Sequence, residues 1–415
     1  MNIDKPKNDG YCATVVEIKN IVPLAGCDNV VATTIFGYQA IVGKDTQIGD
    51  IGLVFPAETQ LSDEFCKFND LYRHAEFNDN KQKKGYIEDN RRVKAIKFRG
   101  HTSNCLFIEL ESIGFANIDP GYLDVGTSFD ILNGYEICKK YEVYHKASSN
   151  QPKSMKSRVQ SKFLPEHIDT TNFFKNSHLI DPEKEIIVTQ KLHGTSVRIG
   201  NTIVERKLSI FEKIWRFFGV NIVETEYDYV YGSRKVIKDA NDTDKKGFYD
   251  FDLWTNEGKK LVGLLPENYI VYAEILGYTP EKKEIQKNYS YAIEPGLAEL
   301  YVYRIAVINN QGQMHDLTYD QVVEFCRSTG IKVVPEVWRG KMKDFVVNDF
   351  IDKNYFNEGM VHCLCLGDQD LVDEGVVIRC DGLTPILLKA KSPKFLEMET
   401  KVLDTGTEDL ESSQK

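Results

Sequence analysis

The first third of the chain alternates short apolar runs with polar turns. Such runs cover residues 11–18, 30–42 and 51–55, and Gly37, Gly43, Gly49 and Gly52 punctuate them. Apolar runs of this length, bounded by turn residues and without helical periodicity, are typical of β-strands. We also expect residues 93–98 and 106–110 to pair as a hairpin. Residues 1–145 are therefore predicted to form a small β-domain.

Beyond residue 163 the pattern mixes strands with helices. Strands are predicted over residues 185–192, 269–276, 300–308, 375–379 and 385–390, and a helix over 319–328 that ends at Gly330. Because the strands come in neighbouring runs, an antiparallel sheet is favoured over a doubly wound one. The predicted fold class is α+β, with an OB-like β-barrel, or alternatively a small β-sandwich, followed by an antiparallel-sheet domain.

One short segment, residues 209–218, has the pattern of an amphipathic helix. Phe211, Ile214, Trp215 and Phe218 fall on one side of it. We expect this apolar side to pack against the sheet of the second domain.

The chain's divisions follow from shifts in composition. Residues 146–162 are rich in Ser, Gln, Lys and Pro and lack apolar periodicity, which is typical of a linker. The predicted parts are thus a β-domain over 1–145, a basic linker over 146–162, the α+β domain over 163–400 and a polar tail over 401–415.

Composition narrows the class of protein. A length of 415 residues, 42% of them hydrophobic and 27% charged, suits two globular domains. No apolar run is long enough to cross a bilayer, and the first residues are polar, so we expect a cytoplasmic protein without a membrane partner.

Nine cysteines, an odd number, are expected to be reduced thiols. His362, Cys363 and Cys365 lack a second ligand pair and predict no zinc site.

Charge is unevenly distributed. The formal net charge is −10, yet residues 81–99 hold eight cationic residues against two acidic ones. This basic patch is either a solvated surface or a nucleic-acid contact, and Lys94, Lys97 and Arg99 are its candidate nucleic-acid-binding residues.

Lys191 is the strongest candidate for chemistry. It ends the apolar run 186–188 and is followed by Leu192-His193-Gly194. A lysine held at a strand end beside a tight turn can direct a deprotonated amine at a phosphorus atom. Taken alone, the pattern is more typical of a solvated hairpin lysine.

Five short motifs follow Lys191. They are Gly232-Ser233-Arg234, Tyr272-Ala273-Glu274, Tyr301-Val302-Tyr303, Asp373-Glu374-Gly375 and Lys389-Ala390-Lys391. Their order resembles the signature of the covalent nucleotidyltransferases, the superfamily of ATP-dependent RNA ligases, DNA ligases and mRNA capping enzymes. The resemblance covers about residues 163–395.

Each motif has a chemical reason to be present. Lys191 would attack the α-phosphate, and Lys389 and Lys391, on one face of a strand, would supply positive charge to the phosphates. Glu374 would hold Mg²⁺ or Mn²⁺. The alternatives are an exposed strand face for the two lysines and a structural turn acid for Glu374.

The resemblance also implies roles in nucleotide binding. Gln190 adjoins the nucleophile, Glu274 would contact the ribose, and Tyr303 would stack on the base. Arg234 would contact the nucleotide and organise the end of the strand being joined. A buried glutamate and a core tyrosine are the alternatives for Glu274 and Tyr303.

Among these enzymes the chain resembles double-strand-repair RNA ligases, and in its layout RNA ligase family 5. It has Lys-Leu-His-Gly where DNA ligases and capping enzymes have Lys-x-Asp-Gly, and only 24 residues follow Lys391, too few for a carboxyl-terminal OB domain. Arg304 stands where an aspartate often follows the aromatic residue.

The resemblance implies an ATP-dependent enzyme of RNA repair. It would seal 3′-hydroxyl/5′-phosphate nicks in duplex RNA or an RNA/DNA hybrid through lysyl-AMP and an adenylylated 5′ end, with the amino-terminal domain binding nucleic acid. A monomer suffices for this chemistry. A DNA ligase, a capping guanylyltransferase and an inactive nucleic-acid-binding relative are the alternatives.

Overall fold

The structure is a computed structural model, and it describes residues 3–143, 157–238, 252–353, 364–366 and 370–405. Its contacts divide the chain into two compact units. The first unit comprises Met1–Tyr144, Thr171–Ser177 and Ala390–Glu408. The second comprises His145–Thr170, His178–Lys389 and Asp409–Lys415. Most of the expected linker, residues 146–156, and the end of the expected tail, residues 406–415, lie outside the described residues.

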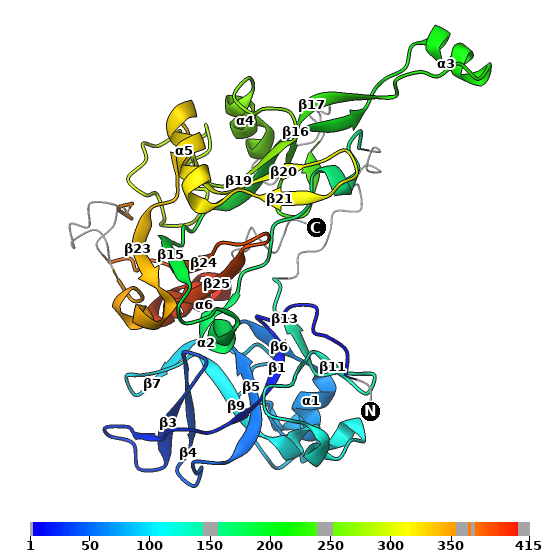
Figure 1. Cartoon of the computed structure of the whole chain (residues 1–415). Coiled ribbons are helices and arrows are strands. Elements are labelled where there is room, and N and C mark those ends of the chain that lie inside the picture. The colour runs from blue at the N-terminus through cyan, green and yellow to red at the C-terminus, as the bar shows by residue number, and fades with distance from the viewer. Residues whose placement is uncertain (1–2, 144–156, 239–251, 354–363, 367–369, 406–415) are drawn as a thin grey trace. The chain divides into compact units, whose positions relative to one another are not determined.

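Antiparallel strands dominate the first unit (Figure 1). One sheet has the order β10-β1-β5-β9, with β1 (Ala13–Glu17), β5 (Ile51–Pro56), β9 (Cys105–Glu109) and β10 (Ser128–Phe129). Another has the order β2-β3-β4, with β2 (Val22–Pro23), β3 (Val30–Ile35) and β4 (Tyr38–Gly43). The Asn104 N–H donates to Gln39 O at 2.9 Å and so links β4 to the start of β9. The two sheets therefore form one barrel-like arrangement.

Three two-stranded pairs add further strands to this unit. They are β6 (Thr59–Leu61) with β13 (Cys138–Lys140), β7 (Ile96–Phe98) with β8 (His101–Ser103), and β11 (Ile131–Leu132) with β12 (Tyr135–Glu136). The expected hairpin between residues 93–98 and 106–110 is wrong. Ile96–Phe98 turns back onto the short polar strand His101–Ser103, while Cys105–Glu109 pairs with β5.

Aromatic side chains fill the core of the first unit. Phe55, Phe65 and Phe129 are fully buried, and the rings of Phe55 and Phe65 meet edge to face with centroids 5.3 Å apart. Such pairs add about 0.5–1.5 kcal/mol to the hydrophobic gain of burial. Phe65 comes from α1 (Asp63–Phe68), which the Ser62 hydroxyl caps.

The first unit also contains α2 (Phe173–Asn176), β14 (Thr171–Asn172) and α6 (Pro393–Asp404). Ser392 caps α6 by accepting from the Phe395 N–H. Arg92, only 2% exposed, binds α6 through Asp404 at 2.8 Å and also pairs with buried Glu58 at 2.6 Å. The contacts thus group α6 with the first unit, and its last turn includes the start of the expected polar tail.

Two antiparallel sheets form the second unit. The larger follows the order β18-β17-β16-β19-β20-β21, and β22 pairs with β20 in parallel. The bounds of these strands are β16 (Thr195–Glu205), β17 (Thr225–Gly232), β18 (Ile237–Lys238), β19 (Tyr269–Gly277), β20 (Ala298–Ile308), β21 (Met314–Asp316) and β22 (Lys332–Val333). The smaller follows the order β25-β24-β15-β23. Its strands are β15 (Glu185–Gln190), β23 (Glu336–Lys341), β24 (Gly375–Cys380) and β25 (Ile386–Lys391).

The predicted α+β class with antiparallel sheets is confirmed. The five strands expected in this region correspond to β15, β19, β20, β24 and β25, and the expected helix to α5 (Tyr319–Thr329). Thr318 and Gln321 form a capping box at the start of α5, and Gly330, with φ of 72°, adopts the left-handed conformation that ends it. The remaining helices are α3 (Ile210–Phe217) and α4 (Leu253–Gly258).

Short 3₁₀ turns connect these elements. They are η1 (Ala75–Phe77), η2 (Leu110–Ala116), η3 (Pro120–Tyr122), η4 (Ser161–Phe163), η5 (Ser177–Leu179), η6 (Lys259–Leu261), η7 (Met342–Asp344) and η8 (Val347–Asp349). Within the described part of the chain, no helix combines the length and the apolar character needed to cross a membrane.

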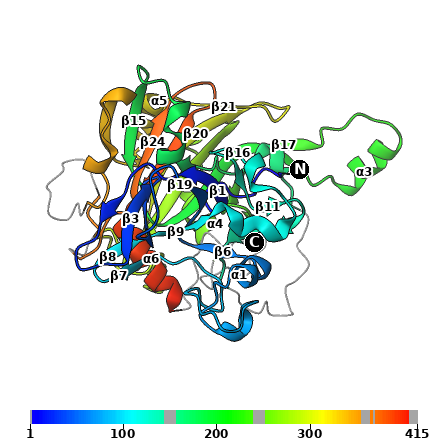
Figure 2. The same ribbon diagram turned by 90° about the horizontal axis from the view of Figure 1, so that it is seen from below.

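The expected packing of helix 209–218 is wrong. Helix α3 has no buried residue, and Phe211 is 71% exposed. Figures 1 and 2 both show α3 beyond the far ends of β16 and β17, away from the sheet of its own unit.

Candidate active site

Lys191 follows the last residue of β15 and is tied to β24. Its backbone N–H donates to Gly375 O at 2.9 Å. Because β15 and β24 are antiparallel, this bond sets Gly375 opposite Lys191 and brings Glu374, the residue before β24, next to it. The Lys191 Nζ lies 2.7 Å from Glu374 Oε2, and the carboxylate side chain is only 5% exposed. Two residues 183 positions apart therefore form a largely buried ion pair.

The loop after Lys191 requires a glycine. A Cβ at Gly194 would lie 2.3 Å from Ile275 O, so any side chain there would displace the neighbouring strand β19. The Gly194 N–H donates to Glu274 Oε1 at 3.1 Å. Glu274 therefore positions the loop that follows Lys191, a role that the sequence did not indicate.

Two further residues hold the same loop. The His193 N–H donates to the Tyr291 hydroxyl at 2.7 Å, and Gln286 Nε2 donates to Gly194 O at 2.8 Å. Gln286 and Tyr291 come from a stretch of the sequence with neither strand nor helix periodicity. We found no signal in the sequence that could have identified them.

The His193 side chain contacts the ion pair. Its Nδ1 lies 3.7 Å from Glu374 Oε2, and its ring meets Tyr289 edge to face with centroids 4.9 Å apart. The Tyr289 hydroxyl donates to Val372 O at 2.8 Å, just before the Asp373-Glu374 pair. Tyr289 thus connects the loop of Lys191 to the segment that carries Glu374.

Asp373 and Gln190 form a buried polar pair beneath the site. Gln190 Nε2 donates to Asp373 Oδ2 at 2.9 Å and to Leu364 O at 3.0 Å. Burial raises the pKa of Asp373 well above its usual value; the Gln190 hydrogen bond opposes this shift, and the charge of Glu374 adds to it. Gln190 lines the pocket described next, but its amide is engaged in this structural pair.

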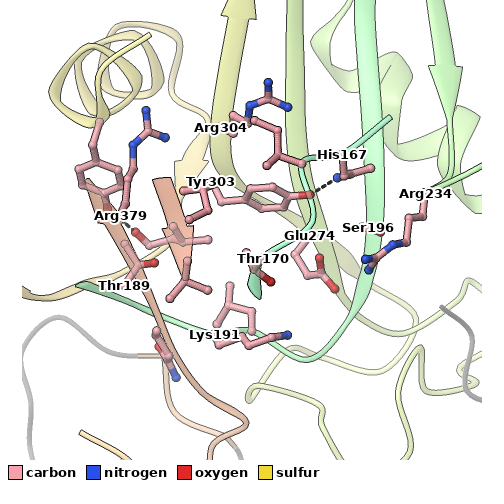
Figure 3. Close-up of a pocket in the computed structure, with 17 residues that line it drawn as sticks. His167, Thr170, Thr189, Lys191, Ser196, Arg234, Glu274, Tyr303, Arg304 and Arg379 are labelled. Carbon is pink, nitrogen blue, oxygen red and sulfur yellow. Dashed lines mark hydrogen bonds between the residues drawn. The ribbon is translucent and has the colours of Figure 1, made fainter. Parts of the chain in front are cut away.

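A pocket lies beside Lys191 (Figure 3). Its lining comes from both sheets and includes His167, Thr170, Thr189, Gln190, Lys191, Ser196, Arg234, Glu274, Tyr303, Arg304 and Arg379. The structure thus brings together five of the predicted site residues, Gln190, Lys191, Arg234, Glu274 and Tyr303.

Tyr303 presents an aromatic ring to this pocket. It is partly buried, and its hydroxyl is hydrogen-bonded to His167 Nδ1. The His167 ring also meets Tyr272 edge to face at 5.1 Å. His167 was missed in the sequence, because a single histidine outside any strand or helix pattern carries no signal.

Arg304 has a structural role. It is 1% exposed, and its Nη2 donates to Asp316 Oδ2 at 3.1 Å on the neighbouring strand β21. Its guanidinium lies 4.3 Å from the centroid of the Tyr272 ring. Arg304 therefore forms a buried ion pair in place of the aspartate expected at this position.

Three buried polar atoms at the pocket lack hydrogen-bond partners among the described residues. They are Ser196 Oγ, Arg304 Nη1 and Arg379 Nη1. Buried donors almost always have partners in folded proteins. The pocket is thus suited to a polar ligand with several acceptor atoms.

Arg234 follows β17 at the edge of the pocket. Its Nη2 donates to Asp169 Oδ1 at 2.7 Å, and Asp169 is largely exposed. An exposed ion pair contributes little to stability. Arg234 can therefore exchange this partner for a phosphate at small cost.

Lys389 and Lys391 lie at the end of β25. Leu387 of this strand lines the pocket, whereas Lys389 is not among the lining residues. The Lys391 Nζ lies 3.2 Å from both Glu399 oxygens of α6, within the first unit. Their roles toward phosphate remain predictions.

In the basic patch of residues 81–99, two of the three candidate nucleic-acid-binding residues are paired with acidic residues. Lys94 Nζ pairs with Glu88 at 2.7 Å and with Asp404 at 2.9 Å, and Lys97 pairs with Glu397 at 3.4 Å. Arg99 Nη1 donates to Gly26 O at 3.0 Å. A groove of about 940 Å³ in this unit is lined by Arg73, Tyr86, Lys94, Phe98 and Phe107, among others. Nucleic-acid binding by Lys94, Lys97 and Arg99 stays a prediction.

Metal-binding residues are sparse. Within the described ranges, no group of three or more His, Cys, Asp or Glu side chains could hold a metal ion. Magnesium commonly uses one or two carboxylates and takes its other ligands from substrate phosphates and water. A single carboxylate, that of Glu374, is enough for this pattern. Cys365 is a free thiol, and His362 and Cys363 lie outside the described residues.

A lysine with a carboxylate partner, beside a pocket lined by an aromatic ring and arginines, defines a nucleotidyltransferase-like site at the meeting of two antiparallel sheets. The family model described as RNA ligase matches residues 184–391, half of the chain. The chain therefore belongs to the RNA ligase family, as the order of its motifs predicted. No curated protein sequence matches it.

Solved structures of Naegleria gruberi RNA ligase share the fold. A lysine-to-alanine mutant with ATP and Mn has 18% identity and a TM-score of 0.59, over 95% of this chain and 99% of that one. A glutamate-to-alanine mutant with ATP and Mn has 17% identity and a TM-score of 0.61, over 93% and 98%. The enzyme with PPi has 16% identity and a TM-score of 0.60, over 94% and 98%. At such identities the likeness establishes the fold of nearly the whole chain.

Proposed function

We propose that this RNA ligase uses ATP to form a lysyl-AMP bond at Lys191 and seals 3′-hydroxyl/5′-phosphate nicks in duplex RNA or an RNA/DNA hybrid. The observation that carries the proposal is the Lys191 Nζ, held 2.7 Å from Glu374 Oε2 at the wall of the pocket. The fold shared with ligase structures that contain ATP and Mn supports ATP and a divalent cation as its cofactors.

In the first transfer the lone pair of Lys191 Nζ attacks the α-phosphorus of ATP. The phosphorus–nitrogen bond forms, the bond to the bridging oxygen breaks, pyrophosphate leaves, and the nitrogen releases a proton to solvent. The backbone bond from Lys191 to Gly375 and the three bonds to the loop fix the direction of the amine. Such positioning accounts for much of the rate gain in group transfer.

Glu374 would hold Mg²⁺ or Mn²⁺ together with phosphate oxygens. The cation would supply neutralising charge to the triphosphate. Because Glu374 also pairs with Lys191, a cation taken up by this carboxylate would weaken its hold on the ammonium group. Metal binding and release of the nucleophile are therefore coupled in this proposal.

The pocket residues would bind the rest of the nucleotide. Tyr303, which lines the pocket, would offer a ring face to the base, and Glu274, which bonds the loop after Lys191, would contact the ribose. Ser196, Arg304 and Arg379 each carry a buried polar atom that nucleotide acceptors would satisfy. Lys389 and Lys391 would neutralise phosphate charge during transfer.

Two further transfers complete sealing. The 5′-phosphate oxygen of the nick attacks the lysyl-AMP, which frees Lys191 and forms a 5′-5′ pyrophosphate link. The 3′-hydroxyl then attacks the 5′-phosphate, loses its proton and displaces AMP. Arg234, at the pocket edge, would contact the strand end, and Lys94, Lys97 and Arg99 the duplex backbone.

One chain carries all of these catalytic groups, so the monomer is the proposed catalytic unit. The eight cysteines in the described residues are free, which fits the cytoplasmic location that we propose.

A nick-sealing assay with labelled nucleotide tests the proposal. Label from ATP should enter the protein, and labelled nicks with a 3′-hydroxyl RNA end should be sealed. The Lys191→Ala variant should do neither, whereas Lys343→Ala, which removes an exposed lysine paired with Glu183, should do both. Label transfer from GTP but not from ATP would favour a capping enzyme. Sealing of all-DNA nicks alone would favour a DNA ligase. A protein that forms no adduct with either nucleotide would be an inactive relative.

A further inference from the structure

Helix α3 carries an apolar surface at the tip of the β16–β17 hairpin (Figure 1). We call this surface the apolar tip and define it by Ile210, Phe211, Ile214, Trp215, Phe217, Phe218, Val220 and Val223. All eight side chains are between 45% and 86% exposed. The register of the hairpin continues without a break to Glu205 and Thr225, so the apolar tip is carried on a regular two-stranded support.

The apolar tip is locally ordered. Ser209 and Glu212 form a capping box at the start of α3. Arg206 pairs with Glu212 and donates to Val223 O at 3.0 Å, which closes the loop on itself. The apolar side chains face outward from a helix with defined ends, and α3 has no buried residue.

The two faces of α3 are cleanly separated. At 100° per residue, Ile210, Phe211, Ile214, Trp215 and Phe217 share one side of the helix. Glu212, Lys213 and Arg216 share the other. Helices with this pattern bury the apolar side against a partner surface.

The exposed apolar area is large for a monomer. Phe211, Trp215, Phe217 and Phe218 are 71%, 55%, 86% and 75% exposed. With roughly 200 Å² for each aromatic side chain, these four alone expose more than about 500 Å². The largest patch of a typical monomer is about 300–600 Å². With its four aliphatic residues, the apolar tip approaches the ~800 Å² that each partner contributes to a standard interface.

The charges near the apolar tip favour a second copy over a lipid or nucleic acid. Residues 205–226 hold four basic and four acidic side chains, in a chain with a net charge of −10. Two of the four cations are also paired: Arg216 lies 3.0 Å from Glu224, and Arg206 is bound to Glu212. The balanced charge gives no general attraction to anionic lipids or phosphates, and it lets two copies meet here without net repulsion.

We propose that two copies of the chain associate symmetrically through their apolar tips, with the apolar face of each α3 packed against that of the other. In a two-fold interface each copy presents the same patch to the other. Because this region holds equal numbers of acidic and basic side chains, the two copies do not repel each other there. The eleven residues of β16 span roughly 35 Å at the usual rise of a strand, so the dimer contact lies far from Lys191. The inference does not depend on the proposed function, and each chain keeps its own site.

Sedimentation velocity of the full chain over a wide concentration range tests the inference. We expect a discrete dimer for the wild type and a monomer for Trp215→Glu and Phe217→Glu. Each substitution should raise the dimer dissociation constant by about 30-fold or more, as for a central interface residue. Leu383→Glu, at a 79% exposed position in the turn between β24 and β25, is the matched control and should remain a dimer.

The other results overturn the proposal. They are a wild type that is monomeric at every concentration, a dimer that both glutamate variants retain, a species that grows beyond two copies, and a monomer that binds phosphatidylcholine vesicles through the apolar tip. The label-transfer assay on each variant shows whether its active site is intact, so loss of the dimer with normal labelling cannot be ascribed to misfolding.

Discussion

The Lys191 amine lies 2.7 Å from a carboxylate oxygen of Glu374, and the same oxygen lies 3.7 Å from His193 Nδ1. One buried carboxylate thus contacts the proposed nucleophile and the histidine of its own loop. The hydrogen bonds from β24, Glu274 and Tyr291 hold that loop in place. In the proposed mechanism, catalysis depends on how Glu374 is shared between Lys191 and a cation.

Replacing Glu374 with glutamine should raise the Mg²⁺ concentration that adenylation requires. The amide keeps a hydrogen-bonding oxygen but loses the charge that attracts a cation. We expect the Mg²⁺ concentration for half-maximal adenylation to rise roughly tenfold or more. Titration of label transfer against Mg²⁺ measures this shift. An unchanged midpoint would argue against Glu374 as a metal ligand.

Replacing Tyr291 with phenylalanine should slow adenylation without weakening ATP binding. The hydroxyl accepts the His193 N–H at 2.7 Å, and its loss leaves a partly buried donor without that partner, at about 1–3 kcal/mol. We expect kcat for adenylation to fall about tenfold with little change in KM. Tyr301→Phe is the matched control, because its hydroxyl bonds Glu299 instead of the loop. Equal losses in both variants would contradict a positioning role.

Ionisation of the buried Asp373 carboxyl group should lower the stability of the protein as the pH rises. Burial raises the pKa of its carboxyl group above the unfolded value, so the favourable contribution of the neutral form is complete below about pH 3.8 and is lost as pH climbs toward the folded pKa. In Asp373→Asn this loss is absent. The Tm of the variant relative to wild type should therefore increase as the pH rises above about 3.8, as calorimetry would show. A constant difference would contradict the shift.

Substitutions of Arg304 and Asp316 should have non-additive effects on the free energy of unfolding. The pair is buried, with side chains 1% and 3% exposed. Arg304→Met leaves Asp316 without its partner, at a cost of about 3–5 kcal/mol in the free energy of unfolding. The double variant Arg304→Met/Asp316→Leu should recover most of that loss. Urea denaturation distinguishes this outcome from simple additivity, which would contradict the pairing.

Much of the fold was readable from the sequence because apolar runs and turn residues act locally. The strand that precedes Lys191, the strand that follows Glu374 and the helix that ends at Gly330 were predicted in this way. The strand His101–Ser103 was missed, because three polar residues carry no apolar alternation. The hairpin prediction then took the next apolar run instead.

The order of motifs identified the family, but it could not supply the contacts between distant residues. The partner of Arg304 lies on another strand, and Asp404 and Glu397, which balance Lys94 and Lys97, lie some 300 positions away. Helix α3 was predicted correctly as an element, whereas its packing was not. An amphipathic pattern shows that a face needs a partner and leaves the identity of the partner open.

The most direct test of the central claim is to locate the adduct. The protein is incubated with ATP and Mg²⁺, digested under conditions that preserve phosphoramide bonds, and its peptides are sequenced by mass spectrometry. We predict AMP on the Nζ of Lys191, with Lys389→Ala and Lys391→Ala giving less of the adduct at the same position. AMP on another residue, or an unmodified Lys191 in a protein that seals nicks, would contradict the account.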